Sequence, residues 1–364
     1  MFVPANYNEA MLLLACSLFC WGSWGNSAKF SKLSFPNFYL IFGCSLFFCS
    51  TILGFILGAD YYEQDVQHHD FLRNLNNATL SSISYALASG AIFNFSNSLL
   101  AVLIGLVGLS VSFPICIGLS LITGTILDYL VQPGHTNFHL LCVGLFLAVL
   151  ALLSMAAAHK MKNVNTLNQQ SEETPLVVGE LDSEEIGGTG NNKLIFLCIL
   201  CGLTMGMFPP LSTASMDNSR EGHLIPCTCM FFFTLSAMIT TFPIVFYLHH
   251  YPLTTTTTIT TTGRRLSFCD GFRASSIMDN LWPCFGGFVW SVGTLFNFIS
   301  GNKVDYSIAY AIGQSAPVVA TLWGLIYFKE FRGAPSKSYV LLLLMFVFYG
   351  GAVAIIARSS SERM

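Results

Sequence analysis

The longest run of uncharged residues limits the folds that this chain can adopt. Residues 74–127 form a run of 54 amino acids without Asp, Glu, Lys or Arg. A helix crosses the ~30 Å hydrocarbon core of a bilayer with about 20 residues, so this run is long enough for two crossings. It divides around Gly108, which predicts one helix over Ser81–Val107 and another over Val111–Val131. We therefore expect an all-α membrane protein.

Other uncharged runs predict ten spans, five on each side of an acidic, polar segment. Charged residues make up 10% of the chain, far fewer than the roughly 25% of a soluble domain. The expected organisation is a first five-helix repeat over 1–158, a polar linker over 159–192 and a second five-helix repeat over 193–364. The predicted spans are Ala10–Ala28, Leu33–Ala59, Ser81–Val107, Val111–Val131, Asn137–Ala158, Leu194–Met216, Ile225–His249, Leu281–Gly301, Val304–Phe328 and Ser338–Ala357.

The two halves of the chain resemble each other weakly. Residues 90–130 can be set against 287–327 without a gap, which pairs Gly90 with Gly287. An odd number of helices in each repeat places the two halves in opposite orientations, as in many secondary transporters. The expected fold is thus ten transmembrane helices arranged as a five-plus-five inverted repeat.

The distribution of positive charge predicts the orientation. Eleven of the 16 Lys and Arg residues lie in connections after odd-numbered spans, and Lys and Arg are enriched in cytoplasmic loops. This bias places both termini outside and the linker 159–192 in the cytoplasm. Asn77-Ala78-Thr79, a glycosylation sequon, falls in a loop that this topology places outside. No retention signal is visible, so the plasma membrane is the expected location.

Several function classes are excluded. The net charge is −3 without a concentrated basic patch, which excludes nucleic acid as a partner. Cys198 and Cys201 form a C-x-x-C pair, but no second pair and no spaced His pair accompany it, so no metal site is expected. The linker ends in "GGTGNNK", which departs from a phosphate-binding loop at Asn192 and after Lys193. We expect no catalytic residues and no cofactor, and the chain is not expected to be an enzyme.

Uncharged polar and aromatic residues at membrane depth are candidates for a solute site. Polar groups in hydrocarbon are costly without a partner, so they tend to face the bundle interior or a water-filled path. The same residues can instead join helices or anchor at the interface, and both interpretations stay open. Amides and Trp faces suit a neutral, hydrogen-bonding, planar solute. The substrate-binding candidates are Trp24, Asn26, Asn94, Asn97, Trp290, Asn297, Gln314 and Trp323.

Two prolines predict helix kinks at matching places in the two halves. Pro317 removes a backbone hydrogen bond and predicts an unpaired carbonyl near Gly313, beside Gln314. Pro114 takes the corresponding place in the first half. Kinked helices with polar residues are what a binding site at the bilayer midplane requires.

Few charged residues lie near the predicted spans. Asp128 is the one acid clearly inside an apolar stretch, four residues before Gln132. This position predicts that Asp128 reaches the outer interface, and proton coupling is its alternative role. Lys329 and Glu330 end the ninth span and are expected to pair with each other at the cytoplasmic surface.

At these helices the chain resembles a known family. "GAIFNFSNSLLAVLIGLVGLSVSFPICIGLSLITGTILDYLVQP" and "VGTLFNFISGNKVDYSIAYAIGQSAPVVATLWGLIYFKEFRGAP" resemble the signature helices of the ureide permease-like and glucose/rhamnose-type permeases in the drug/metabolite transporter superfamily. "CWGSWGNSAKF" resembles their first helix. The resemblance covers most of the chain and implies a ten-helix inverted-repeat fold.

The resemblance also implies a function. The family carries out secondary transport by alternating access, and its plant members move allantoin, uracil and related heterocycles with proton coupling. The expected protein is a permease for a small neutral polar solute, with the lipid bilayer as its surroundings. A glucose-type sugar carrier and a non-transporting receptor or scaffold are the alternatives. Coupling to protons and assembly into a homo-oligomer are left open.

Overall fold

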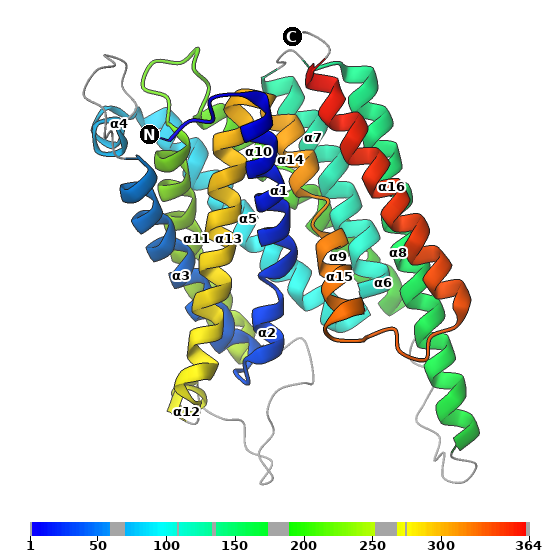
Figure 1. Cartoon of the computed structure of the whole chain (residues 1–364). Helices are drawn as coiled ribbons and strands as arrows, with labels where there is room; N and C mark the ends of the chain where they lie inside the picture. The colour runs from blue at the N-terminus through cyan, green and yellow to red at the C-terminus, as the bar shows by residue number, and fades with distance from the viewer. Residues whose placement is uncertain are drawn as a thin grey trace.

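The computed structural model describes a bundle of helices (Figure 1). All the regular secondary structure in the described residues is helical. The described residues are 2–58, 70–107, 109–132, 136–173, 189–251, 268–273 and 275–361.

The helices follow the predicted spans closely along most of the chain. Up to the end of α8 the elements are α1 (Tyr7–Ser23), α2 (Asn26–Phe30), α3 (Phe35–Gly58), α4 (Phe71–Asn77), α5 (Leu80–Val107), α6 (Leu109–Ser112), the π-helix η1 (Phe113–Ile117), α7 (Gly118–Val131) and α8 (Phe138–Glu173). After it come α9 (Thr189–Met205), α10 (Phe208–Ser215), α11 (Pro226–His250), α12 (Phe268–Arg273), α13 (Ile277–Val304), α14 (Tyr306–Gly313), α15 (Pro317–Ile326) and α16 (Ser336–Ser361).

Membrane-length helices dominate the described residues. Eight segments are long and apolar enough to cross a bilayer. A further apolar helix, Ile115–Val131, is shorter, and α1 has 17 residues. The structure therefore supports a membrane protein, while the count of ten spans stays a prediction. The eight segments are Phe35–Gly58, Leu80–Ile104, Phe138–Lys162, Asn192–Ser215, Pro226–His250, Ile277–Val304, Tyr306–Ile326 and Ser336–Ser359.

Three of the predicted spans are not continuous helices. The first is interrupted at Trp24-Gly25 and the sixth at Gly206-Met207, and the ninth is divided between Gly313 and Pro317. Glycine is a poor helix former, and prolines in the first turn of α10 and α15 cannot donate the backbone hydrogen bond that would continue the preceding helix. Each interruption therefore follows from a local backbone requirement that a search for uncharged runs does not detect.

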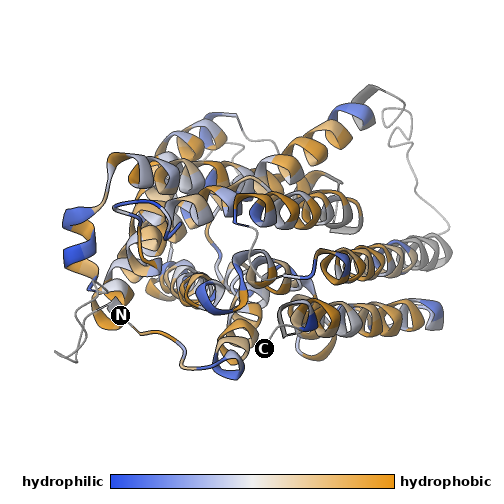
Figure 2. Cartoon of the chain, turned by 90° about the horizontal axis from the view of Figure 1, so that it is seen from above, coloured by the Kyte–Doolittle hydropathy of each residue, from blue (hydrophilic) through white to orange (hydrophobic). Residues whose placement is uncertain are grey.

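The outer surface of the bundle is apolar. Phe146, Phe246 and Leu343 expose 63, 67 and 63% of their surface. Seen from above, hydrophobic colour runs along the helices and hydrophilic colour gathers mainly at their ends and connections (Figure 2). Large exposed apolar surfaces mark membrane contact, so these side chains face lipid.

Helices of the two sequence halves pack against each other throughout the bundle. Helix α1 packs along α13, α3 and α5 both pack along α11, and α8 packs along α16. The N-terminus and the C-terminus lie at the same end of the molecule, and α8 extends beyond the bundle at the opposite end (Figure 1). Helix α8 continues to Glu173, inside the segment predicted to be a linker, and residues 174–188 lie outside the described residues.

The contact between α5 and α11 is unusually close at Gly90. A Cβ atom at this position would overlap the backbone carbonyl oxygen of Phe233. The two helix backbones therefore touch directly here, and only the absence of a side chain at Gly90 permits that distance.

Candidate functional site

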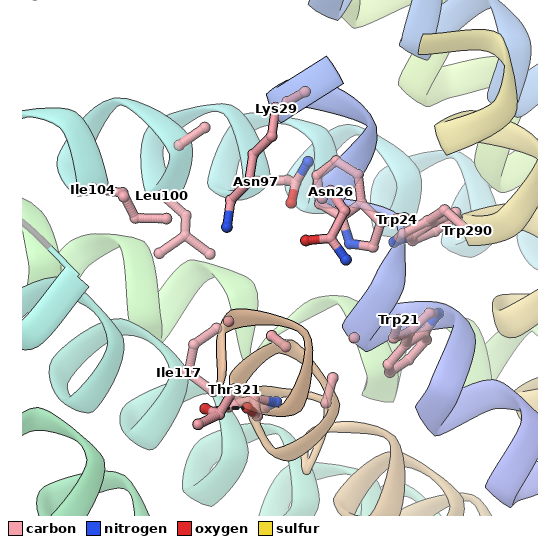
Figure 3. A pocket seen from close by; sticks show the side chains of 18 of the residues that line it. Trp21, Trp24, Asn26, Lys29, Asn97, Leu100, Ile104, Ile117, Trp290 and Thr321 are labelled. Atoms are coloured by element: carbon pink, nitrogen blue, oxygen red, sulfur yellow. Dashed lines mark hydrogen bonds between the residues drawn. The ribbon is translucent and has the colours of Figure 1, made fainter. Parts of the chain in front are cut away.

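The structure contains a cavity of about 570 Å³ in the interior of the bundle. Its wall includes residues of α1, α2, α3, α5, α8, α10, α13 and α15, and it lies where the interrupted helices meet (Figure 3). Trp24 and Gly25 at the first interruption and Gln314 and Ala316 at the third line the cavity, and Phe208 lines it directly after the second. Because broken helices leave backbone and polar side chains available, this is a favourable place for a solute.

Neutral amides supply the polar part of the wall. Asn97 on α5 is 6% exposed, and its amide nitrogen donates to the Tyr39 hydroxyl at 3.2 Å. The oxygen of that amide faces the cavity, as does the side chain of Asn26 (Figure 3). Gln314, 9% exposed, adds a third amide from the break between α14 and α15. The cavity can therefore accept and donate hydrogen bonds without charge.

Aromatic rings close the inner end of the cavity. Trp21 and Trp290 are stacked with ring centroids 6.4 Å apart and planes 16° apart, and Phe93 lies 4.6 Å from Trp290. The Trp21 indole nitrogen donates to the Thr294 hydroxyl at 3.0 Å, which fixes the orientation of the ring. These flat faces can stack on a planar solute.

Charged residues line the cavity only near the end of the molecule away from the termini. Among the described lining residues they are Lys29 and Glu330, whose side chains form an ion pair at 2.5 Å. The Lys29 ammonium also lies 3.9 Å from the centre of the Phe328 ring. The prediction that Glu330 pairs with Lys329 is wrong, because the turn after α15 directs Glu330 toward α2 instead. This ion pair joins the first and second halves of the chain.

The cavity brings together some of the residues proposed for the site from the sequence and leaves others out. Trp24, Asn26, Asn97, Trp290 and Gln314 line the cavity, and Pro317 does too. Asn94 and Trp323 do not, because both are used in helix packing. Asn94 bonds with Tyr39, Thr240 and Thr241, and the Trp323 indole donates to Ser23 at 2.8 Å.

Asn297 and Asp128 lie in a second, much smaller pocket. Its volume is about 10 Å³, which is room for about one water molecule. Asp128 is 2% exposed, so the prediction that it reaches the outer interface is wrong. It lies on the inward face of α7, where one carboxyl oxygen has no partner among the described residues.

The two prolines interrupt the helices in different ways. At Pro317 the chain leaves one helix and starts another, but the Gly313 carbonyl is not unpaired as predicted. It accepts a hydrogen bond from the Ala316 backbone at 3.0 Å, because a tight turn replaces the lost helical bond. Around Pro114 the backbone forms the π-helix η1, and the proline ring itself lies outside the described side chains.

Some lining residues carry no distinctive sequence signal. Tyr39, Phe93, Met155 and Thr321 line the cavity, but apolar and aromatic residues on membrane helices look the same in sequence whether they face a cavity, a neighbouring helix or lipid. Phe208 has one usable signal, since it follows Gly206-Met207 and precedes two prolines.

Known proteins match most of this chain. A family model described as Ureide permease matches residues 159–359. Ureide permease 2 of Arabidopsis thaliana is 24% identical over 338 residues, which cover 81% of this chain and 82% of that protein. Ureide permease 4 of Arabidopsis thaliana is 21% identical over the full length of both, and probable ureide permease A3 of Vigna unguiculata is 22% identical over 83% of this chain and 89% of its own.

A solved crystal structure has a similar fold. Its TM-score to this chain is 0.57 at 11% identity, and the match covers 96% of this chain and 98% of the other. The bundle described above is therefore an architecture that has been observed by crystallography.

Proposed function

This chain belongs to the ureide permease family, and from that premise we propose that it carries a ureide or a related nitrogen heterocycle, such as allantoin or uracil, across a membrane. Relatives named ureide permeases match 81 to 100% of the chain. The transported solute is small, neutral and polar, and it binds in the 570 Å³ cavity.

The chemistry of the cavity wall carries this proposal. Ligand sites are typically apolar concavities of about 300–1,000 Å³ with a few placed polar groups, and this cavity has that character. Asn26, Asn97 and Gln314 provide both donors and acceptors, while Trp24 and Trp290 provide flat faces. A planar heterocycle that carries N–H and C=O groups on its edge would use both kinds of contact.

The interrupted helices support a ten-span inverted repeat. The first predicted span of each half is broken, at Trp24-Gly25 and at Gly206-Met207. The fourth of each half is irregular too, at η1 and between α14 and α15. Discontinuous helices at corresponding positions of two halves are characteristic of transporters that alternate access around a central site.

Uptake measurements test the proposed function. Cells that express the protein should accumulate labelled allantoin or uracil above empty-vector cells, and an excess of the same unlabelled compound should abolish the signal. Accumulation of labelled glucose alone would instead assign the protein to the sugar carriers. If none of the three solutes accumulates although the protein is at the cell surface, the proposed substrate class is wrong.

We also propose that transport is coupled to protons through Asp128, and the same uptake assay tests this. Asp128 is buried in the pocket that adjoins the cavity, and one of its oxygens has no partner in the described part of the chain, as expected of a group that gains and loses a proton during transport. Acidifying the outside should stimulate heterocycle uptake, and Asp128→Asn should remove this stimulation at unchanged surface expression. Stimulation that persists in Asp128→Asn would exclude Asp128 as the coupling residue.

We also propose that both termini lie outside the cell, in the plasma membrane. Most of the described Lys and Arg residues lie at the end of the bundle away from the termini, and positive charge favours the cytoplasmic side. Figure 1 places α2, the C-terminal part of α8, α12 and the connection from α15 to α16 at the far end, and these segments and their flanking residues hold Lys29, Lys32, Lys160, Lys162, Arg273, Lys329, Arg332 and Lys337. It places α4, the connection from α10 to α11 and the last turns of α13 and α16 at the end with the termini, and these hold Arg73, Arg220, Lys303 and Arg358.

Two readouts test this orientation. Asn77 ends α4 at the end of the molecule that carries the termini, and it is exposed. In eukaryotic cells, glycosidase treatment should shift the mobility of the protein, and Asn77→Gln should abolish that shift. An antibody against a C-terminal tag should bind intact cells. Binding only after permeabilisation would reverse the proposed orientation.

A further inference from the structure

The large cavity and the small pocket are separated by a wall of two aromatic side chains. Of the residues that the structure describes, Trp21 and Phe208 line both spaces. The large cavity lies on the side of Lys29 and Glu330, away from the termini. Asp128 and Tyr306 line the pocket on the other side of the wall. The wall therefore closes the cavity toward the end of the molecule where the chain begins and ends.

Both wall residues lie beside interrupted helices. Trp21 is in the last turn of α1, directly before the break at Trp24-Gly25, and Phe208 is the first residue of α10, directly after the break at Gly206-Met207. A helix interruption is a place where backbone angles change at little cost, as in hinge motions. Trp21 can thus move with the end of α1, and Phe208 can move with the start of α10, while the helical segment on the other side of each interruption stays packed.

Side-chain contacts hold the wall closed in this conformation. Besides its bond to Thr294, Trp21 is stacked on Trp290. Phe208 packs edge-on against Tyr310, with centroids 5.6 Å apart at 84°, and against Phe93 at 5.4 Å. Aromatic pairs in such geometries stabilise the arrangement only modestly beyond the burial of their area, so the closed wall is held by a few contacts that a conformational change can exchange.

The region beyond the wall is polar although it is sealed. Ser212, Thr213 and Asn297 line the small pocket together with Asp128. Ser17 lies one helical turn before Trp21 on α1, and Ser300 lies nearly one turn after Asn297 on α13, so each continues the same helix face toward the termini. The side-chain oxygens of Ser17 and Ser300 and one carboxyl oxygen of Asp128 have no partner among the described residues.

Unpaired buried polar groups need a physical reason, because each costs free energy in a bilayer. Water that enters this region in a second conformation would satisfy all three. We propose that Trp21 and Phe208 form the gate of the transport path, and that the polar groups beyond it line the outer half of that path, which is closed in this structure. This inference rests on the proposed transport function. It names Trp21 and Phe208 as the side chains that must move when the site changes from one side of the membrane to the other.

Cysteine labelling tests the gate without any need for a substrate. In inside-out vesicles, a membrane-impermeant methanethiosulfonate reagent reaches the large cavity from the side of Lys29. Ala320→Cys, which lies in the cavity wall, should be labelled above the level of the unsubstituted protein. Thr213→Cys, beyond the gate, should stay at that level. Combining Thr213→Cys with Trp21→Ala should raise its labelling to that of Ala320→Cys.

Controls separate the gate from a general loosening of the bundle. Trp282→Ala removes a Trp of α13 that stacks on Phe30 and does not line either space, and it should leave Thr213→Cys unlabelled. If Trp21→Ala prevents folding, which would show as loss of Ala320→Cys labelling, Phe208→Leu replaces it in the same test. Labelling of Thr213→Cys with both rings intact, or no labelling with either ring truncated in folded protein, would overturn the gate.

The outer half of the path needs its own measurement. In intact cells the same reagent, added outside, should label Ser300→Cys in protein that keeps both rings, because the outer half opens during the transport cycle. Absence of labelling would show that these polar groups are permanently sealed and would overturn this part of the proposal. An uptake assay that fails while the labelling pattern holds would refute the substrate class and leave the gate in place.

Discussion

Replacement of Gly90 by Val is expected to leave almost no folded protein in the membrane. A Cβ at this position overlaps the Phe233 carbonyl oxygen and comes within 2.7 Å of the carbonyl carbon. All three nearest atoms belong to the backbone of α11, so no side-chain rotation can make room. The two helices would have to separate, which exceeds the 1–3 kcal/mol typical of overpacking. The readout is the amount of monodisperse protein extracted in mild detergent.

A matched control exists on another membrane helix. A Cβ at Gly350 in α16 meets nothing within 4 Å, and the residue faces lipid. Gly350→Val should therefore extract at the level of the unsubstituted protein. Monodisperse Gly90→Val at that same level would mean that α5 and α11 do not approach as described.

Removal of the Asn97 side-chain amide is expected to lower solute uptake roughly tenfold or more at unchanged surface expression. A buried hydrogen bond lost from one partner costs about 1–3 kcal/mol, and 1.4 kcal/mol is a factor of ten. The Asn97 oxygen faces the cavity, where an N–H group of the solute would donate to it. The fold should tolerate Asn97→Ala, because the Tyr39 hydroxyl keeps its bond to Asn94 at 3.0 Å. The measurement is initial uptake rate against solute concentration.

The neighbouring residue provides the comparison for this variant. Ser98 is buried to a similar degree on α5, but its hydroxyl donates to the Phe95 carbonyl of its own helix, and it does not line the cavity. Ser98→Ala should transport like the unsubstituted protein. Equal uptake by both variants would remove Asn97 from the site.

The sequence predicts most of the membrane-length helices but does not predict where helices break. The span predicted over Ile225–His249 became α11 from Pro226 to His250, because an uncharged run of that length has few alternatives in a bilayer. The break at Trp24-Gly25 was missed. Many membrane helices contain glycine, and whether one is interrupted depends on neighbours that can satisfy the freed backbone groups.

The candidate site shows the same limit at the level of single side chains. Asn94 and Asn97 lie three residues apart on α5 and are buried to 1 and 6% exposure. In sequence they are equivalent amides on nearly the same helix face. A rotation of less than one third of a turn directs Asn97 into the cavity and Asn94 against Thr240 and Thr241 of α11. The packing of α11 against α5, which the sequence does not show, decides which of the two amides contacts the cavity and which joins helices.

The charges in the cavity wall have an electrical consequence. Lys29 and Glu330 neutralise each other at one end of the cavity, and the amides and rings at its inner end carry no charge. Moving one elementary charge across a membrane potential of 100 mV involves about 2.3 kcal/mol of electrical work. The same potential does no work on an uncharged solute that moves past uncharged groups. Any current that accompanies uptake therefore counts the coupling ions, so recording it together with solute flux gives their stoichiometry directly.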